Sequence, residues 1–124
     1  MTIGELSRRT GVSRRALRYY EQQGLLEPDR RDSGYRDYEE RHVTVVDSIR
    51  TLLAAGLPTA TIADVLPCMG RDGGQLIAEC PELLDVLVGE RERITAAMDE
   101  LASARALLDR IIETSARADV ACAA

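Results

Sequence analysis

The fold is decided by Ser13-Arg14-Arg15-Ala16-Leu17-Arg18-Tyr19-Tyr20-Glu21-Gln22-Gln23-Gly24, a stretch near the start of a 124-residue chain. Ser13 predicts the beginning of a helix, because its hydroxyl can accept a hydrogen bond from an amide of the first turn. Gly24 predicts the end of that helix, because glycine readily adopts the left-handed conformation that stops one. The stretch therefore predicts a short helix of about three turns.

Two sets of side chains share this helix. The apolar set, expected to face a core, comprises Ala16, Leu17 and Tyr20, whereas the outward set comprises Arg14, Arg15, Arg18 and Tyr19. Five arginines fall within residues 8–18, which contain no acidic residue, although the whole protein carries a net charge of −5. Such a local excess repels itself and is typical of a surface that binds a polyanion such as DNA. Simple solvation of the outer helix face is the alternative.

Composition supports a mainly α fold with one DNA-facing half. Hydrophobic residues make up 45% of the chain, but Phe and Trp are absent, so the core must be largely aliphatic. Residues 1–50 hold ten arginines and nine acidic residues, a net charge of +1, whereas residues 51–124 hold six and twelve, a net charge of −6. Only the first half is therefore suited to approach DNA.

The sequence also indicates a compartment. No apolar run approaches the roughly 20 residues of a membrane helix, and no signal peptide opens the chain, so we expect a cytoplasmic protein without a membrane partner. The three cysteines are an odd number at irregular spacing. They do not form a disulfide framework, and reduced thiols are the expectation.

A first helix precedes the arginine-rich one. Thr2 and Glu5 have the spacing of a capping box, which predicts a helix that begins at once and runs to about Arg9. Gly11 then allows a tight turn, and Val12 can pack between the two helices. A helix, a glycine-containing turn and a capped helix with exposed arginines together predict a helix-turn-helix.

A small hairpin, or wing, is expected after Gly24. Two short β-type stretches flank a polar tip that carries Arg30 and Arg31. Alternation along the return strand puts Tyr35 and Asp37 on one face and Arg36 and Tyr38 on the other. A wing lying along a phosphate backbone would need such donors, although an ordinary solvated hairpin has the same pattern.

The remaining elements follow from periodicity. Residues 39–55 form the next predicted helix, a short helix follows from Pro58, and the DNA-binding domain spans residues 1–66. His42, the single histidine, is expected at the surface or at a helix start rather than as a metal ligand. Residues 67–80 are expected to form a connecting loop.

A long helix over residues 81–117 is predicted next, followed by a flexible tail over residues 118–124. Four apolar residues recur every seven positions, namely Leu87, Ile94, Leu101 and Leu108, and a second series offset from them widens the stripe. This heptad pattern is typical of a coiled coil. One such helix cannot bury its seam alone, so the pattern predicts a homodimer.

The N-terminal motifs closely resemble the winged-helix domain of MerR-type transcriptional regulators. The resemblance covers residues 1 to about 66 and depends on Thr2-Ile3-Gly4-Glu5-Leu6, Gly11-Val12-Ser13, Leu17-Arg18-Tyr19-Tyr20-Glu21, Gly24-Leu25-Leu26, Pro28, Arg30 and Gly34-Tyr35-Arg36-x-Tyr38. It implies a mainly α fold in which the winged helix-turn-helix precedes an antiparallel coiled coil. It also implies a homodimer that binds near-palindromic double-stranded promoter DNA and distorts DNA whose spacer is too long for RNA polymerase.

Carried onto this chain, the resemblance also assigns the DNA contacts. The recognition-helix set comprises Ser13, Arg14, Arg15, Arg18 and Tyr19, with Tyr20 partly buried, and the wing set comprises Arg36 and Tyr38. Most of these residues would position phosphates, and Arg14 or Arg18 would read bases.

Metal-sensing MerR-type proteins use cysteines near the start of the long helix and beyond its end, and Cys80 and Cys122 occupy comparable positions. Two thiolates from opposite chains would suit linear Cu(I) or a reversible disulfide, but are too few for tetrahedral zinc. The paired cysteines of the family's metal-binding loop and the cluster of its iron–sulfur sensors are missing. We therefore expect structural cysteines, with Cys68 a small buried residue, and no resident metal or cofactor.

The sequence thus predicts a dimeric, sequence-specific DNA-binding transcriptional regulator, with or without an effector. The alternative from another class is a protein-interaction module that works through its coiled coil. An architectural DNA bender would share the winged head, but it does not need so long a dimer helix. An enzyme is not expected, because no nucleophile–base pair, phosphate-binding loop or catalytic carboxylate pair is recognisable.

Overall fold

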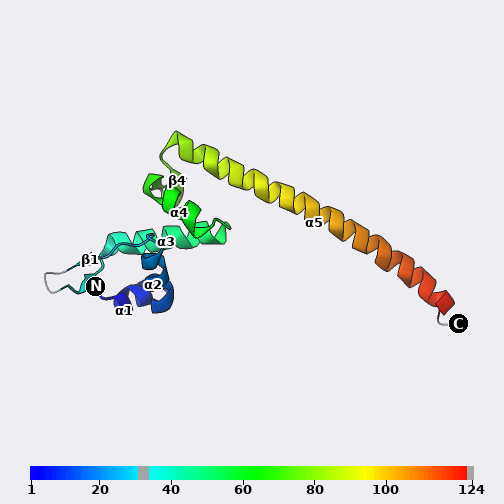
Figure 1. The fold of residues 1–124 in the computed structure, drawn as a ribbon, viewed down its shortest axis with the longest axis horizontal. Helices are drawn as coiled ribbons and strands as arrows, with labels where there is room; N and C mark the ends of the chain where they lie inside the picture. The colour runs from blue at the N-terminus through cyan, green and yellow to red at the C-terminus, as the bar shows by residue number, and fades with distance from the viewer. Residues whose placement is uncertain (31–33, 123–124) are drawn as a thin grey trace. The chain divides into compact units, whose positions relative to one another are not determined.

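The computed structural model describes residues 1–30 and 34–122 and divides the chain into two units, Met1–Leu83 and Leu84–Ala124. The first unit, called the head, contains the helix-turn-helix, the wing and a second hairpin, and ends with the first residues of the long helix. The second unit is the rest of that helix (Figure 1). In order, the helices are α1 (Ile3–Thr10), α2 (Arg14–Gln22), α3 (Glu40–Ala54), α4 (Thr59–Val65) and α5 (Pro81–Cys122), and a 3₁₀ turn, η1 (Leu66–Cys68), follows α4.

The first two helices have the caps that the sequence predicts. The Thr2 hydroxyl accepts a hydrogen bond from the Glu5 amide (3.2 Å), and α1 ends where Gly11 takes a left-handed φ of 74°. Ser13 caps α2 by accepting from the Ala16 amide (3.1 Å). Each cap satisfies an amide that the helix leaves unpaired, so the turn between the helices is fixed locally.

The core of the head lies where α1 packs against α2 and α3, and where α3 packs against α4. Its centre is aliphatic, as composition predicts. The fully buried aliphatic side chains are Leu6, Leu17, Leu26, Val46, Ile49 and Ile62. A hydrogen bond also links α3 to α1, because the Arg50 guanidinium of α3 donates to the carbonyl of Thr10, the last residue of α1 (2.7 Å). These contacts hold α2 against the rest of the head.

The wing is shorter than its sequence pattern predicts. Strands β1 (Asp29–Arg30) and β2 (Arg36–Asp37) pair antiparallel, with Asp29 opposite Asp37 and Arg30 opposite Arg36. The expected tip residue Arg31 lies outside the described residues, as does the side chain of Arg30. Because β2 ends at Asp37, the strand alternation does not extend to Tyr38, which instead leads into α3.

The prediction of a loop over residues 67–80 is wrong. Strands β3 (Met69–Asp72) and β4 (Gln75–Ala78) pair antiparallel in a second hairpin, and Gly73 and Gly74 take left-handed φ values of 57° and 82° at its turn. A two-residue turn with both φ values positive matches the twist of the strands that it joins, and glycine adopts it without strain. The hairpin docks on α3, since Arg71 donates to the Ser48 hydroxyl (3.0 Å).

The hairpin also overturns the expectation of reduced cysteines. Cys68 and Cys80 flank its two strands and form a disulfide, with their Cα atoms 5.6 Å apart. Antiparallel pairing brings the two ends of the segment together, so residues twelve positions apart in sequence become neighbours. Cys68 is partly exposed rather than buried.

Helix α5 is longer than predicted, because it continues through residues that we expected to be a flexible tail and ends at Cys122. Its 42 residues correspond to about 63 Å of helix. The predicted seam residues Ile94, Leu101 and Leu108 are exposed, and Leu87 is half-buried. In the part of the chain that the structure describes, no helix is long and apolar enough to span a membrane.

The packing of α2 predicts a matched pair of stability effects. Leu17→Ala should lower the free energy of unfolding of the head by about 2–5 kcal/mol, because Leu17 is fully buried and its removal leaves a cavity. Arg15→Ala, on the exposed face of the same helix, should change it by no more than about 0.5 kcal/mol. All four tyrosines lie within the first 38 residues, so tyrosine fluorescence during urea unfolding reports on the head alone. Equal effects of the two substitutions would contradict the described packing of α2.

Candidate nucleic-acid interface

The outward face of α2 carries the residues that sequence reasoning assigns to DNA. Ser13, Arg14, Arg15, Arg18 and Tyr19 are all exposed. Among the described residues, Arg14, Arg15 and Arg18 have no acidic side chain within ion-pair distance, whereas most other arginines of the head have a partner. The structure therefore brings three uncompensated guanidinium groups together on one short helix.

Arg14 is positioned by α1. A Cβ atom built on Gly4 would lie only 2.7 Å from Nη2 of Arg14, so the guanidinium passes directly over the backbone of α1 at this buried glycine. Arg14 therefore lies across the junction of the two helices.

Two of the predicted contact tyrosines belong to the core. Tyr20 is 7% exposed and Tyr38 is 1% exposed. The Tyr38 ring meets the His42 ring edge to face, with centroids 5.5 Å apart. The interpretation of Tyr38 as a wing contact is therefore wrong, because the chain turns inward after β2 and carries this residue into the core. Partial burial of Tyr20 was expected, and the structure removes it from the candidate contact surface as well.

The wing is joined to α2 by an ion pair. Arg36 Nε donates to Glu21 Oε1 (2.9 Å), and this hydrogen bond raises the pKa of Arg36 above its ordinary value. The Arg36 side chain is still about half exposed. Arg36 of the wing thus lies beside α2, at the edge of the surface that Arg14, Arg15 and Arg18 form. Glu21 belongs to the sequence motif noted above, but nothing in the sequence reveals that it pairs with Arg36.

A second ion pair joins the wing to α3. Arg41 donates to Asp29 Oδ1 (2.5 Å), and this hydrogen bond holds the pKa of Asp29 below its ordinary value. Arg9 of α1 is compensated in the same way, because it donates twice to Glu40 (2.6 and 2.8 Å) and lowers the pKa of Glu40. Arg9 therefore does not share the uncompensated charge of α2, although it belongs to the same cluster in sequence.

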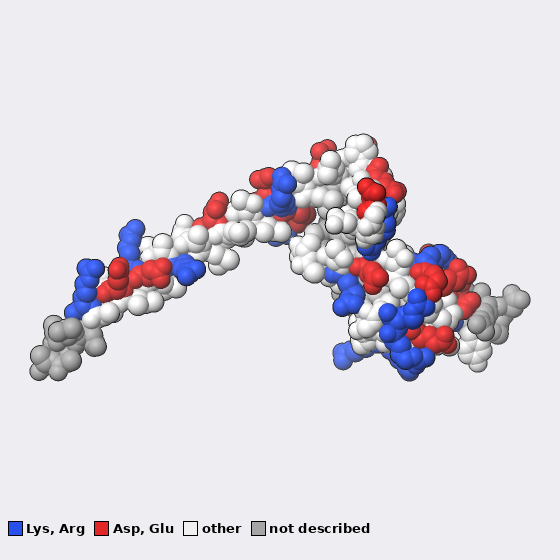
Figure 2. Space-filling view, turned by 180° about the vertical axis from the view of Figure 1, so that it is seen from behind, with Lys and Arg blue, Asp and Glu red and all other residues white. Residues whose placement is uncertain are grey.

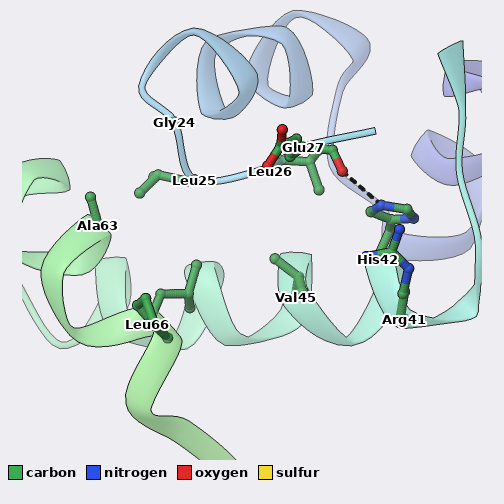
Figure 3. Close-up of a pocket in the computed structure, with 10 residues that line it drawn as sticks. Gly24, Leu25, Leu26, Glu27, Arg41, His42, Val45, Ala63 and Leu66 are labelled. Atoms are coloured by element: carbon green, nitrogen blue, oxygen red, sulfur yellow. Dashed lines mark hydrogen bonds between the residues drawn. The ribbon is translucent and has the colours of Figure 1, made fainter. Parts of the chain in front are cut away.

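His42 holds the beginning of α3 against the segment that precedes the wing. Its Nδ1 accepts from the Glu39 amide (2.8 Å), so Nε2 carries the proton and donates to the Glu27 carbonyl (2.9 Å; Figure 3). The helix-start position was expected, but the side chain is buried rather than at the surface. An adjoining cavity of about 300 Å³ lies between residues 24–27, α3 and α4.

The cysteines compared with those of metal-sensing relatives, Cys80 and Cys122, have different places in the structure. Cys80 is bonded to Cys68, so it is not a thiolate ligand in this structure. The side chain of Cys122 lies outside the described residues. Among the residues that the structure describes, no three His, Cys, Asp or Glu side chains are grouped to hold a metal ion.

Basic and acidic side chains are not spread evenly over the surface of the head. On the face shown in Figure 2, basic side chains gather in one region of the head with acidic side chains beside them. Acidic residues of the head pair with arginines in the two ion pairs of the wing and in the ion pair between α1 and α3. The internal pairs rigidify the head, while the α2 arginines stay available to an anionic partner.

A capped helix-turn-helix, a wing beside its second helix and an arginine-rich outer face define a DNA-binding protein of the winged helix-turn-helix class. The sequence pattern described as "MerR HTH family regulatory protein" matches residues 1–67. The chain belongs to this family, and it is a DNA-binding transcriptional regulator rather than an enzyme.

Named relatives and solved structures agree with this placement. The mercuric resistance operon regulatory protein of Bacillus cereus is 32% identical over 100 residues, which are 80% of this chain and 73% of that protein. Heavy metal-dependent transcription regulator 2 of Rhizobium meliloti (strain 1021) is 33% identical over 82% of this chain and 69% of its own length. The lead(II) complex of the transcription regulator PbrR691 from Ralstonia metallidurans CH34 has a TM-score of 0.69 at 32% identity, covering 88% of this chain and 83% of that one.

The wing anchor predicts a pH effect. Because the pKa of Asp29 is lower in the folded protein, its tie to Arg41 is complete above the ordinary aspartate pKa and is lost as the pH falls through the lowered value. Arg41→Ala should therefore move the titration of Asp29 to higher pH, toward that of an ordinary aspartate. The carboxyl carbon resonance of Asp29, followed by NMR across the pH range in both proteins, measures the shift. An unchanged titration would show that Arg41 does not bind Asp29 in solution.

Proposed function

We propose that two copies of this chain form a homodimer that binds near-palindromic promoter DNA, each copy placing α2 in one major-groove half-site. The observation that carries the proposal is the outer face of α2, where Arg14, Arg15 and Arg18 lie exposed without acidic partners among the described residues. Uncompensated arginines on a rigid helix match the negative charge and the groove width of DNA.

The contacts divide by position on the head. Arg18 lies beyond the first turn of α2. It has no ion partner among the described residues and, unlike Arg14, does not lie over a glycine of α1, so we assign it to base reading. Arg14 and Arg15 lie in the first turn, where we assign them to positioning phosphates, together with Ser13 and Tyr19. Arg36, held beside α2 by Glu21, extends the phosphate contacts from the wing.

Dimerisation is assigned to α5. Large apolar residues, including Ile94, Met98, Leu101, Leu108 and Ile111, are exposed along the helix in a single chain. A stripe with this heptad spacing is stable in water only when a second helix covers it. The seam supports pairing, and the resemblance to MerR-type proteins supports the antiparallel arrangement.

The dimer would set the distance between the two half-sites that it binds. Binding sites of helix-turn-helix dimers lie about one helical turn of DNA apart, so the distance between heads must be set by the protein. We propose that the bound dimer distorts the promoter between the half-sites and so changes how RNA polymerase engages it. The membership of the chain in the MerR family supports this proposal of promoter distortion.

Substitution of Arg18 tests the DNA contact. Arg18→Ala should weaken binding to the cognate promoter by about 1–3 kcal/mol, because a strong base contact is lost. Arg91→Ala removes a similar charge from the exposed surface of α5 and is the matched control, for which affinity should change little. Fluorescence anisotropy with labelled promoter DNA, repeated at several salt concentrations, measures both effects. Unchanged affinity of the Arg18 variant would remove Arg18 from the interface.

Substitution in the α5 stripe tests dimerisation. Leu101→Asp should abolish the dimer and promoter binding together, because a carboxylate in the seam loses its hydration when the helices pair. Ser103→Asp adds the same charge two residues away on a different helix face and should leave the dimer intact. Sedimentation velocity distinguishes the two states. A dimeric Leu101→Asp protein would place the seam elsewhere, and a dimer that binds no DNA would favour a protein-interaction module.

A further inference from the structure

The Cys68–Cys80 disulfide lies at the base of the second hairpin, directly before α5. Cys68 ends η1, and Cys80 precedes Pro81, the first residue of α5. The Glu79 amide donates to the Cys68 carbonyl (2.8 Å), and the Leu83 amide donates to the Cys80 carbonyl (3.1 Å). Leu83 is buried in the head and is its last residue. The disulfide therefore restrains the segment through which the head continues into the dimerisation helix.

The surroundings allow this disulfide to open and close in a folded chain. Both cysteines are partly exposed rather than buried, and access from solvent favours thiol–disulfide exchange. The hairpin has a four-pair ladder of its own and the tie from Arg71 to Ser48 of α3. It does not depend on the covalent bond alone. Breaking the disulfide therefore loosens the base of the hairpin and leaves the ladder and the helical core in place.

We propose that Cys68 and Cys80 form a reversible thiol–disulfide couple that reacts with low-molecular-weight disulfides and controls how rigidly the head is joined to α5. A thiolate of the reduced pair attacks a sulfur of the small disulfide, which forms a mixed disulfide and releases one small thiolate. The other cysteine thiolate then attacks the protein sulfur of the mixed disulfide, closes the Cys68–Cys80 bond and releases the second small thiolate. The protein loses two electrons and two protons, and the small disulfide gains them as two thiols.

The consequence for DNA binding rests on the proposed dimeric function. When the bond is closed, the backbone that leads into Pro81 is held by the disulfide as well as by the two backbone hydrogen bonds. When it is open, this backbone samples more conformations, and the dimer must lose that freedom to place both heads on their half-sites at once. The oxidised dimer should therefore bind the promoter about three- to tenfold more tightly than the reduced dimer.

Peptide mapping tests the chemistry without DNA. The full chain carrying Cys122→Ser is equilibrated with mixtures of reduced and oxidised glutathione, quenched with an alkylating reagent and digested with trypsin. Arg71 lies between the two cysteines, so the oxidised form yields peptides 51–71 and 72–91 joined by a disulfide, and the reduced form yields both alkylated. We expect these forms to interconvert reversibly while circular dichroism stays constant. A bond that does not form with oxidised glutathione, or that reduced glutathione does not open in the folded chain, would overturn the proposal.

Promoter affinity measured in both states tests the regulatory consequence. The affinity ratio of oxidised to reduced protein should be about three to ten with Cys122→Ser alone. It should fall to one when Cys68→Ser is added, and Cys80→Ser provides the same control if the first variant is poorly folded. Equal affinities of the two states would overturn the regulatory role. Failure of both states to bind any promoter would refute the proposed function, and the peptide map would still decide whether the couple exists.

Discussion

Burial of Leu17 determines how α2 is rotated, and the surface that we propose to face DNA depends on this rotation. Leu17 is fully buried and Tyr20, three residues later, is nearly so, which fixes the inner face of the helix. Successive residues of a helix point about 100° apart, so the positions on either side of Leu17 are directed away from the core. Arg18, next to Leu17, and Arg15, two residues before it, are therefore exposed, whereas Arg14, about one turn from Leu17, reaches the surface over the backbone of α1 at Gly4. The arrangement of the binding surface is thus a consequence of the packing of the core.

Ion pairs and hydrogen bonds from α3 hold the other parts of the head around this core. Arg41 contacts strand β1 of the wing, and His42 contacts the segment before the wing. Arg50 contacts the end of α1, and Ser48 accepts a hydrogen bond from Arg71 of the second hairpin. Each tie uses one charged or polar group of α3 on a different neighbour. Exposed pairs of this kind contribute little stability individually, but they restrict orientation. Helix α3 therefore acts as the frame that fixes the wing and the hairpin relative to the helix-turn-helix.

The sequence predicted those parts of the fold that local chemistry determines. The caps at Thr2 and Ser13, the turn at Gly11 and the outward arginines of α2 each depend on residues a few positions apart. The inward path of Tyr38 could not be predicted, because strand alternation does not indicate where a two-residue strand ends. The second hairpin left a local signal in Gly73-Gly74, but its short strands have weak alternation. The Cys68–Cys80 disulfide depends on this hairpin, because strand pairing brings the two cysteines together. Without the hairpin in the prediction, the disulfide could not be predicted either.

The two units differ in what keeps them folded. The head has its own buried core, so its structure does not require a second chain. Helix α5 leaves Leu101, Leu108 and Ile111 mostly exposed, and helices gain most of their stability from packing an apolar face. In the proposed homodimer, a second helix would cover this face, and such pairing depends on protein concentration. If, as proposed, a single head covers one half-site, occupancy of a palindromic promoter responds to concentration more steeply than one-site binding does. In that proposal, positions along the α5 seam would affect DNA binding although they lie outside the head.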